Sequence, residues 1–434
     1  MRLPWPSRRL LIAACIVAVA AALTAIELTR PPTSAPTQST PGAVPSRGRG
    51  WLVLLSGEGA RVYACLTEGD YLYACGCARA PGKRVRAFVV KVDLKRGEVA
   101  WCKAVSGFEG SAFKLIKRGD DLIVCGAWEL KGFICCLSDD GQLRWGYLCD
   151  APLHGLLDLG DSVLAYSSDG VLVSLKLSGE AVYQVKLLVE GADGVWRSPW
   201  LHCLRFAGGR FYAAGSCDRL VSEGSGSDLF LACLEFPSRV LWSEAIGTSS
   251  DDRLQVVLCS NESLYACGWT WCPTFGEADI LVARLSLSGE LEWVRVVGGR
   301  RWESVLAACL VDGRVRMLGF TYSFAPAQEV LVVELDEGGR ALRSWTIGVA
   351  ALRGEAGRRV SWTEMRWGAF KAEERQLVSK EVEVEVSRPR VKVVEVGVLH
   401  AARLALVDLA ELPLSIAAMH PESLSLLQLR TVRG

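Results

Sequence analysis

A unit of about 50 residues recurs along most of the chain, and this repeat constrains the fold more than any other feature of the sequence. The word LYACG occurs at 72–76 and again at 264–268. Related short segments, also closed by glycine, end at Gly126, Gly215 and Gly319. A fixed period of this length is typical of chains that repeat one supersecondary unit. The sequence therefore predicts a repeat architecture.

Each copy of the unit contains the same sub-patterns in the same order. A polar turn leads to an aromatic residue, and an apolar run such as AFVVKVD or DILVARLSL comes before that turn. The order predicts a strand, a tight turn, a strand closed by glycine, a longer loop, an apolar strand, and a last strand that begins near the aromatic residue. Seven such aromatic residues enclose six units: Trp51, Trp101, Trp145, Tyr183, Trp242, Trp293 and Trp345.

A four-stranded antiparallel meander that repeats radially is a β-propeller. We therefore predict an all-β fold in which 51–348 form a β-propeller of four-stranded blades. Six blades are expected, with seven as the alternative. A strand from one chain end is expected to complete the last blade, because this removes exposed strand edges.

After residue 348 the period is lost. The segment KEVEVEVSRPRVKVVEV alternates strictly and then turns at Arg388–Pro389, which predicts a hairpin with Val386 opposite Val391 and Glu385 opposite Lys392. We predict that 349–434 form a small β-rich C-terminal appendage, with a seventh blade as the alternative.

The combination of apolar run, turn and tryptophan resembles known repeat families. It is similar to the SBBP-type propeller repeats of bacteria and archaea and to the repeats of pyrroloquinoline-quinone (PQQ) propellers, the latter especially in VKVDLKRGEVAW, which ends at Trp101. The resemblance covers about 51–348 and implies the propeller fold. It implies little about activity, because such repeats are structural and host many functions.

The N-terminal region predicts export. Three arginines precede an uncharged run at 10–26, so 1–30 are expected to be a signal peptide or a signal anchor that keeps the N-terminus inside. The run spans about 26 Å, slightly less than a hydrocarbon core of about 30 Å, and both alternatives stay open. Residues 31–50 form a Pro/Thr/Ser-rich linker. The rest is expected to be extracytoplasmic, anchored to the cell membrane through 10–26 or secreted.

Charge and composition narrow the function classes. The formal net charge is +1, which argues against nucleic acid as a partner. Asn261 is the only asparagine and there are four methionines, beside 49 basic and 48 acidic side chains, a composition that resembles hyperthermophile proteins. The four histidines form no spaced cluster, so neither a metal site nor a cofactor is predicted.

Two modifications are predicted. Exported proteins keep disulfides, and a hairpin that turns about Gly69–Asp70 would place Cys65 opposite Cys75, which predicts a bridge between them. The alternative is that both thiols are reduced and fill the core. Asn261 begins a glycosylation sequon in an expected exposed turn.

One face of the predicted propeller carries longer, aromatic loops. Aromatic rings around a propeller mouth can stack on sugars or bind a protein partner, and the alternative is that they cover neighbouring blades. The candidate binding residues are Trp128, Trp196, Trp269, Trp271, Trp302 and Tyr322. We predict a cell-surface binding or scaffold module for a glycan or protein.

The alternative function is a polysaccharide-acting hydrolase or lyase on the same face. Paired carboxylates would be needed for glycoside hydrolysis, and solvated loop charges are the competing explanation of the acids there. The acids are Asp193, Asp251, Asp252, Glu277 and Glu303. No residue is assigned a catalytic role.

Overall fold

The computed structural model describes only part of the chain. The described residues are 52–56, 61–79, 85–96, 98–105, 109–235, 239–272, 274–324, 329–348, 371–396, 400–401, 406–408, 415–419 and 430–431. The predicted N-terminal segment and linker, 1–50, lie outside them. All regular elements in these ranges are β-strands, and the described part of the chain contains no helix long and apolar enough to span a membrane.

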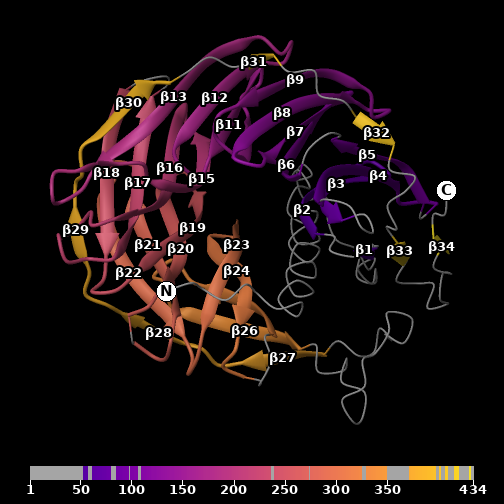
Figure 1. The fold of residues 1–434 in the computed structure, drawn as a ribbon. Helices are drawn as coiled ribbons and strands as arrows, with labels where there is room; N and C mark the ends of the chain where they lie inside the picture. The colour runs from indigo at the N-terminus through magenta and orange to yellow at the C-terminus, as the bar shows by residue number, and fades with distance from the viewer. Residues whose placement is uncertain are drawn as a thin grey trace, which may run out of the picture. The chain divides into compact units, whose positions relative to one another are not determined.

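The chain divides into two compact units. The described part of the first unit lies within 153–399 and contains four successive four-stranded antiparallel meanders (Figure 1). Their strands are β10(Leu153–Asp158), β11(Ser162–Ser167), β12(Val171–Lys176), β13(Ala181–Glu190); β15(Trp200–Ala207), β16(Arg210–Asp218), β17(Ser227–Glu235), β18(Arg239–Gly247); β19(Asp252–Cys259), β20(Ser263–Thr270), β21(Asp279–Ser286), β22(Leu291–Gly298); and β23(Glu303–Val311), β24(Arg314–Thr321), β25(Glu329–Leu335), β26(Ala341–Gly348). A short strand, β14(Trp196–Arg197), pairs with the end of β13.

The second unit lies within 52–152 and 400–431 in its described part and contains two more meanders. Their strands are β2(Arg61–Glu68), β3(Tyr71–Arg79), β4(Val85–Asp93), β5(Glu98–Val105); and β6(Gly110–Arg118), β7(Asp121–Trp128), β8(Lys131–Ser138), β9(Leu143–Cys149). A three-stranded sheet is formed by β1(Leu52–Ser56), β33(Ser415–Met419) and β34(Arg430–Thr431). The predicted meander is therefore confirmed in six copies among the described residues, including the irregular copy around Tyr183. The described part of the chain is an all-β repeat of four-stranded meanders of the kind that form propeller blades.

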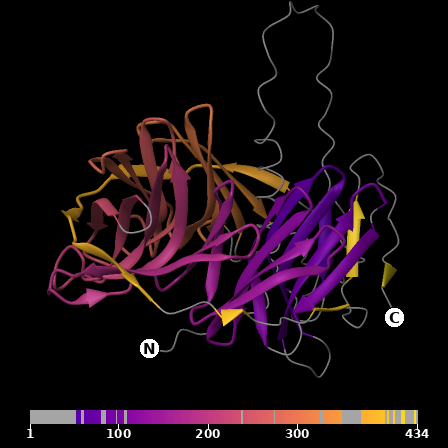
Figure 2. The same cartoon turned by 90° about the horizontal axis from the view of Figure 1, so that it is seen from above.

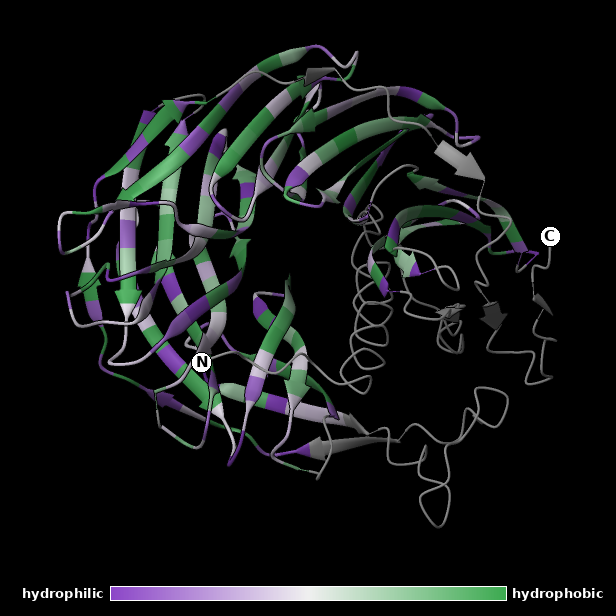
Figure 3. Ribbon diagram, in the orientation of Figure 1, coloured by the Kyte–Doolittle hydropathy of each residue, from purple (hydrophilic) through white to green (hydrophobic). Residues whose placement is uncertain are grey.

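The core lies between neighbouring sheets, as expected for propeller blades. One buried cluster joins Leu231 of β17 to Leu281 of β21, and another joins Val282 of β21 to Leu331 of β25. The middle strands of the meanders are correspondingly rich in hydrophobic residues (Figure 3). Each sheet is stabilised mainly by apolar area that it buries against the next sheet.

The glycine that closes each second strand has a specific steric cause. In the first strand of the sheet a β-bulge follows the residue that pairs with this glycine, as at Leu254, which pairs with Gly268. The bulge directs the carbonyl oxygen of Arg253 at the glycine, and a Cβ on Gly268 would lie 1.9 Å from that oxygen. Only glycine fits there. The same arrangement recurs at Gly76, Gly126, Gly215 and Gly319.

The aromatic residue of the fourth strand has an equally specific partner in the next sheet. The indole of Trp242 lies over Gly289 in the turn between β21 and β22 and donates its N–H to the carbonyl of Leu287, at 3.0 Å. Gly289 has φ +92°, and a Cβ there would lie 2.7 Å from the indole. Trp101 and Trp293 make the same contact with the glycine turns of β8–β9 and β25–β26. This tryptophan–glycine contact explains why a glycine turn and a tryptophan alternate along the sequence.

The C-terminal segment runs along the outer edges of the sheets in reverse order (Figure 2). In the first unit β27(Lys371–Arg375), β28(Val378–Glu381), β29(Glu385–Ser387) and β30(Val391–Glu395) pair with β26, β22, β18 and β13. In the second unit β31(His400–Ala401), β32(Leu406–Asp408) and β33 pair with β9, β5 and β1. We call these strands the edge belt. They occupy backbone groups that would otherwise be exposed strand edges.

The predicted hairpin at Arg388–Pro389 is therefore wrong. Val386 lies opposite Ile246 and Val391 lies opposite Val189, so the two halves belong to different sheets. The alternation of apolar and polar residues that suggested a hairpin has another cause. An edge strand also turns one of its two faces toward the core, and this requires the same alternation. Ion pairs between Arg388 and Glu244 and between Arg390 and Glu190 hold the segment where it crosses.

The register of the first hairpin overturns the geometry predicted for a Cys65–Cys75 bridge. Glu68 pairs with Tyr71, so Cys65 lies opposite Ala74 and Cys75 lies opposite Ala64. This shift of one residue places the two cysteines on opposite faces of the sheet. They pack into two different hydrophobic clusters, and both are free thiols. Burial raises the pKa of both thiols, which suits core filling.

Changing Gly289 to alanine tests the tryptophan–glycine contact. The new Cβ meets the Trp242 indole at a residue with positive φ, so the free energy of unfolding should fall by about 1–3 kcal/mol in denaturant titration. Gly224→Ala is the control, because a Cβ added at Gly224 would have no atom within 4 Å. Equal stability of both variants would contradict the contact's importance.

Candidate functional site

The bulges of two neighbouring first strands build the core of the candidate site. Trp200 begins β15 and Arg253 lies near the start of β19, and both come directly before the residue at which the bulge forms. The carbonyl oxygens of both residues point at a second-strand glycine, Gly215 or Gly268. The two side chains therefore occupy the same repeat position in adjacent sheets. Bulges commonly re-aim side chains at functional sites.

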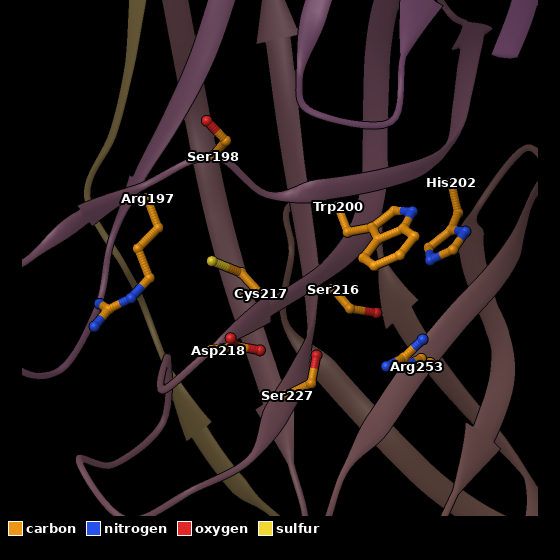
Figure 4. Close-up of a pocket in the computed structure, with 9 residues that line it drawn as sticks. All are labelled: Arg197, Ser198, Trp200, His202, Ser216, Cys217, Asp218, Ser227 and Arg253. Atoms are coloured by element: carbon orange, nitrogen blue, oxygen red, sulfur yellow. The ribbon is translucent and has the colours of Figure 1, made fainter. Parts of the chain in front are cut away.

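A cavity of about 240 Å³ lies beside these two residues (Figure 4). Its lining combines polar and apolar groups and comes from β14 to β17, from the loop before Trp200 and from β19. The lining residues are Arg197, Ser198, Trp200, His202, Ser216, Cys217, Asp218, Ser227 and Arg253.

The guanidinium of Arg253 lies between two indoles. Its Cζ is 5.5 Å from the ring centroid of Trp200 and 5.5 Å from that of Trp269. Trp200 is 54% exposed and stacks at 5.9 Å on His202, with an interplanar angle of 5°. Arginine over an aromatic face is attracted by the ring quadrupole, and this holds the side chain in place.

His202 is a neutral member of the site. Burial, and then the charge of Arg253, lower the pKa of His202 to about 4. Its Nε2 atom is buried and has no hydrogen-bond partner in the described part of the chain. Burial also raises the pKa of Cys217 to about 11, so this thiol stays protonated at neutral pH.

From Trp269 the aromatic contacts continue along its own sheet and into the next one. Trp269 meets Trp271 at 6.1 Å between ring centroids, Trp271 meets Trp302 at 5.9 Å, and Trp302 stacks on Tyr322 at 6.1 Å. Trp271 is 42% exposed. We call this set of residues the aromatic band. Its rings are Trp200, Trp269, Trp271, Trp302 and Tyr322, and Arg253 links the first ring to the second. It follows the loops at one end of three successive sheets.

The structure brings together four of the six predicted binding residues, Trp269, Trp271, Trp302 and Tyr322. Trp196 lies elsewhere, on β14, with the ammonium of Lys392 from the edge belt 4.1 Å from its ring centroid. Trp128 belongs to the second unit and packs against a hydrophobic cluster there.

The sequence also places Trp200 among the aromatic residues of the candidate face, whereas it does not point to His202 or Arg253 as binding residues. The signal that could have found Arg253 is its place in the repeat, which is the same as that of Trp200. Each lies one residue before the position that pairs with the strand-closing glycine.

The predicted acids are mostly engaged in local hydrogen bonds. Both carboxylate oxygens of Asp252 accept from Thr248, and Glu303 accepts from the N–H of Gly299 at 2.7 Å and from Thr321 at 2.5 Å. Asp193 is bound by Arg197.

Of the other two acids, Asp251 accepts the N–H of Ser227 at 3.0 Å, and Glu277 is exposed. The acids with two partners tie loops to strands, so the arrangement favours a structural role for them. In the described ranges no three His, Cys, Asp or Glu side chains converge as a metal site would require.

The glycosylation sequon lies in the turn between β19 and β20. Asn261 is exposed, whereas the hydroxyl of Ser263 accepts a hydrogen bond from Arg284 Nε at 3.1 Å. Modification of Asn261 stays a prediction.

No protein-family model matches the chain, and no curated protein sequence is similar to it. Solved structures with a similar arrangement include BamB from Moraxella catarrhalis, with 12% identity and a TM-score of 0.32 over 61% of this chain and 95% of that chain. The WD40 β-propeller domain of Doa1 has 11% identity and a TM-score of 0.39 over 69% and 93%. A europium-containing methanol dehydrogenase has 10% identity and a TM-score of 0.43 over 68% and 77%. Such distant matches carry no argument about function.

The buried carboxyl of Asp252 predicts a pH dependence of stability. Burial raises its pKa from 3.8 to about 6 in the folded state, so its contribution is full below about pH 4 and is lost as the pH rises through 6. Relative to Asp252→Asn, the wild type should therefore lose up to roughly 3 kcal/mol of unfolding free energy between pH 4 and pH 7.

The control for this prediction is Glu223→Gln, a change at an exposed acid of the same unit. Its stability should run parallel to that of the wild type across the pH range. If the unfolding free energies of Asp252→Asn and the wild type also run parallel against pH, the pKa of Asp252 does not differ between the folded and unfolded states.

Proposed function

We propose that this protein is a binding module whose aromatic band binds a glycan chain. The observation that carries the proposal is the series of contacts that runs from Trp200 through Arg253 to Trp269 and then from ring to ring as far as Tyr322. Trp200 and Trp271 are exposed by 54% and 42%. Large exposed aromatic groups that form one surface mark interaction sites more often than isolated ones do.

The chemistry of the site suits a sugar. A sugar ring has an apolar face of C–H groups and a rim of hydroxyls, so it needs a flat aromatic surface next to polar side chains. Trp200 offers the surface, and Ser227, Asp218 and Arg253 of the adjoining cavity offer hydrogen-bonding groups. The cavity is smaller than the roughly 300–1,000 Å³ of typical small-molecule pockets. It therefore suits one residue of a chain whose other residues lie along the band.

The proposed location rests on the N-terminal sequence. We propose that the protein is extracytoplasmic and that linker 31–50 displays a propeller at the cell surface, with 10–26 as the membrane anchor. The six meanders support our proposal of a six-bladed propeller. An extracytoplasmic position would bring the aromatic band to surface polysaccharides.

Removing an exposed indole should abolish most of the binding. We expect Trp200→Ala and Trp271→Ala each to weaken binding of the full-length protein to polysaccharides by about tenfold, because each loses a stacking surface. Affinity electrophoresis with a panel of neutral and acidic polysaccharides measures this. Phe206→Ala is the matched control, because Phe206 is 46% exposed and lies at the opposite end of β15. Equal loss in all three variants, or no binding by the wild type, would contradict the proposal.

The anchor predicts that the mature protein stays in the membrane fraction. Because 10–26 carry no charge, an uncleaved segment should resist extraction by high salt and be released only by detergent. Cell fractionation with mass spectrometry of the N-terminus measures this. A soluble mature protein that begins at Leu23 would show that the segment is a cleaved signal.

A further inference from the structure

Two guanidinium groups lie over rings of the aromatic band and have no acidic partner in the part of the chain that the structure describes. Arg253 lies between Trp200 and Trp269, and Arg301 lies over Tyr322, with its Cζ 5.9 Å from the ring centroid. Among the described residues no carboxylate oxygen lies within 4.0 Å of either guanidinium. Arg197, on the other side of the same cavity, is by contrast bound to Asp193.

No described carboxylate pairs with Arg253, although Asp218 lines the same cavity and Asp251 accepts the N–H of Ser227, another lining residue. Figure 4 shows Arg253 near Trp200 and His202, whereas Asp218 lies toward Arg197 and Cys217. The low pKa of His202 means that this neighbour is neutral at pH 7 and competes for no anion. The acid closest in sequence, Asp252, is buried and accepts hydrogen bonds from Thr248.

A stacked guanidinium is a suitable group for binding an anion. The guanidinium of Arg253 lies over two indoles and donates no hydrogen bond to the described residues, so its N–H donors are available to a carboxylate or sulfate. Because the side chain is already held by two rings, little conformational entropy is lost when the anion binds. Two arginines without a described acidic partner on one surface for sugar rings suit a polymer that carries acidic groups along its length.

We infer that the ligand of the aromatic band is an acidic glycan, whose carboxylate or sulfate group is bound by Arg253 while its sugar rings stack on the exposed indoles. This inference rests on the proposed glycan-binding function and specifies its substrate class. Arg301 binds a second acidic group further along the same chain.

The test compares charged and neutral forms of one polymer. Calorimetric titration of the full-length protein uses polygalacturonate against its methyl ester, and dextran sulfate against dextran. We expect at least tenfold tighter binding of an anionic polymer than of its neutral counterpart, an advantage that falls as salt is added. Whichever pair shows this difference identifies the acidic group as carboxylate or sulfate.

Variants then test whether Arg253 is the residue that causes the preference for the anionic polymer. Arg253→Gln should remove most of the preference for the anionic polymer and weaken binding of the neutral polymer much less, because Gln keeps a hydrogen-bonding group in the cavity but loses the charge. Arg253→Lys should restore only part of the preference, because an ammonium lacks the planar pair of donors. Arg239→Gln is the control, because this exposed arginine begins β18 and pairs with Glu235 outside the band.

Three results would overturn the inference. Equal binding of charged and neutral polymers, with Arg253→Gln unchanged, would contradict the acidic ligand but leave glycan binding in place. Binding to none of the four polymers by the wild type would contradict both proposals. Tighter binding of single-stranded oligothymidylate than of any polysaccharide would assign the band to nucleic acid instead.

Discussion

The tryptophan–glycine contact between successive sheets is the interaction on which the rest of the structure depends. Trp101, Trp242 and Trp293 each cover a glycine turn of the following sheet and donate an N–H to a carbonyl of that turn. The contact fills the space between two sheets with a large ring and fixes their relative height with one hydrogen bond. Because a side chain at that glycine would displace the ring, the two residues must occur together.

The constraint reaches the candidate site through the strands. If the sheets are held at one height, the equivalent bulge positions of neighbouring first strands lie at one level. Trp200 and Arg253 occupy that level in adjacent sheets, and the Cζ of Arg253 lies 5.5 Å from the ring centroid of Trp200. The loops that follow β20 and β24 then add Trp271 and Tyr322 at the same end. The repeat thus fixes the positions that form the aromatic band, and each sheet places different side chains at those positions.

The edge belt solves a second problem of this architecture, the exposed edge of each fourth strand. Instead of one strand that closes one sheet, successive short strands of the C-terminal segment cover the edges in turn. Side-chain contacts add to the backbone pairing, as where the hydroxyl of Ser387 donates to the carbonyl of Leu220 at 2.8 Å. Covered edges reduce the tendency of a sheet protein to aggregate.

The sequence was sufficient for the local repeat but not for the register or the long-range pairing. The meander order and the burial of the LYACG cysteines could be predicted, because both follow from patterns within one unit. The Cys65–Cys75 pairing failed by a single residue, since a two-residue turn gives a different register from the assumed one.

The hairpin at Arg388–Pro389 failed for a different reason. Alternation fixes which face is buried but not which strand is the partner, and β18 and β13 offered free edges. At the site, loop aromatics such as Trp271 and Tyr322 could be grouped from the repeat. The repeat position of Arg253 could be read from the sequence, but its role could not, because that role depends on indoles contributed by a neighbouring sheet and by its own.

The most direct test of this account is a crystal structure of the protein with a bound oligogalacturonate or sulfated oligosaccharide. The account predicts that a sugar ring lies against Trp200 or Trp271 and that its acidic group lies within hydrogen-bonding distance of the Arg253 guanidinium. A sugar bound outside Trp200–Tyr322, with Arg253 still stacked between its two indoles and touching no ligand, would contradict it.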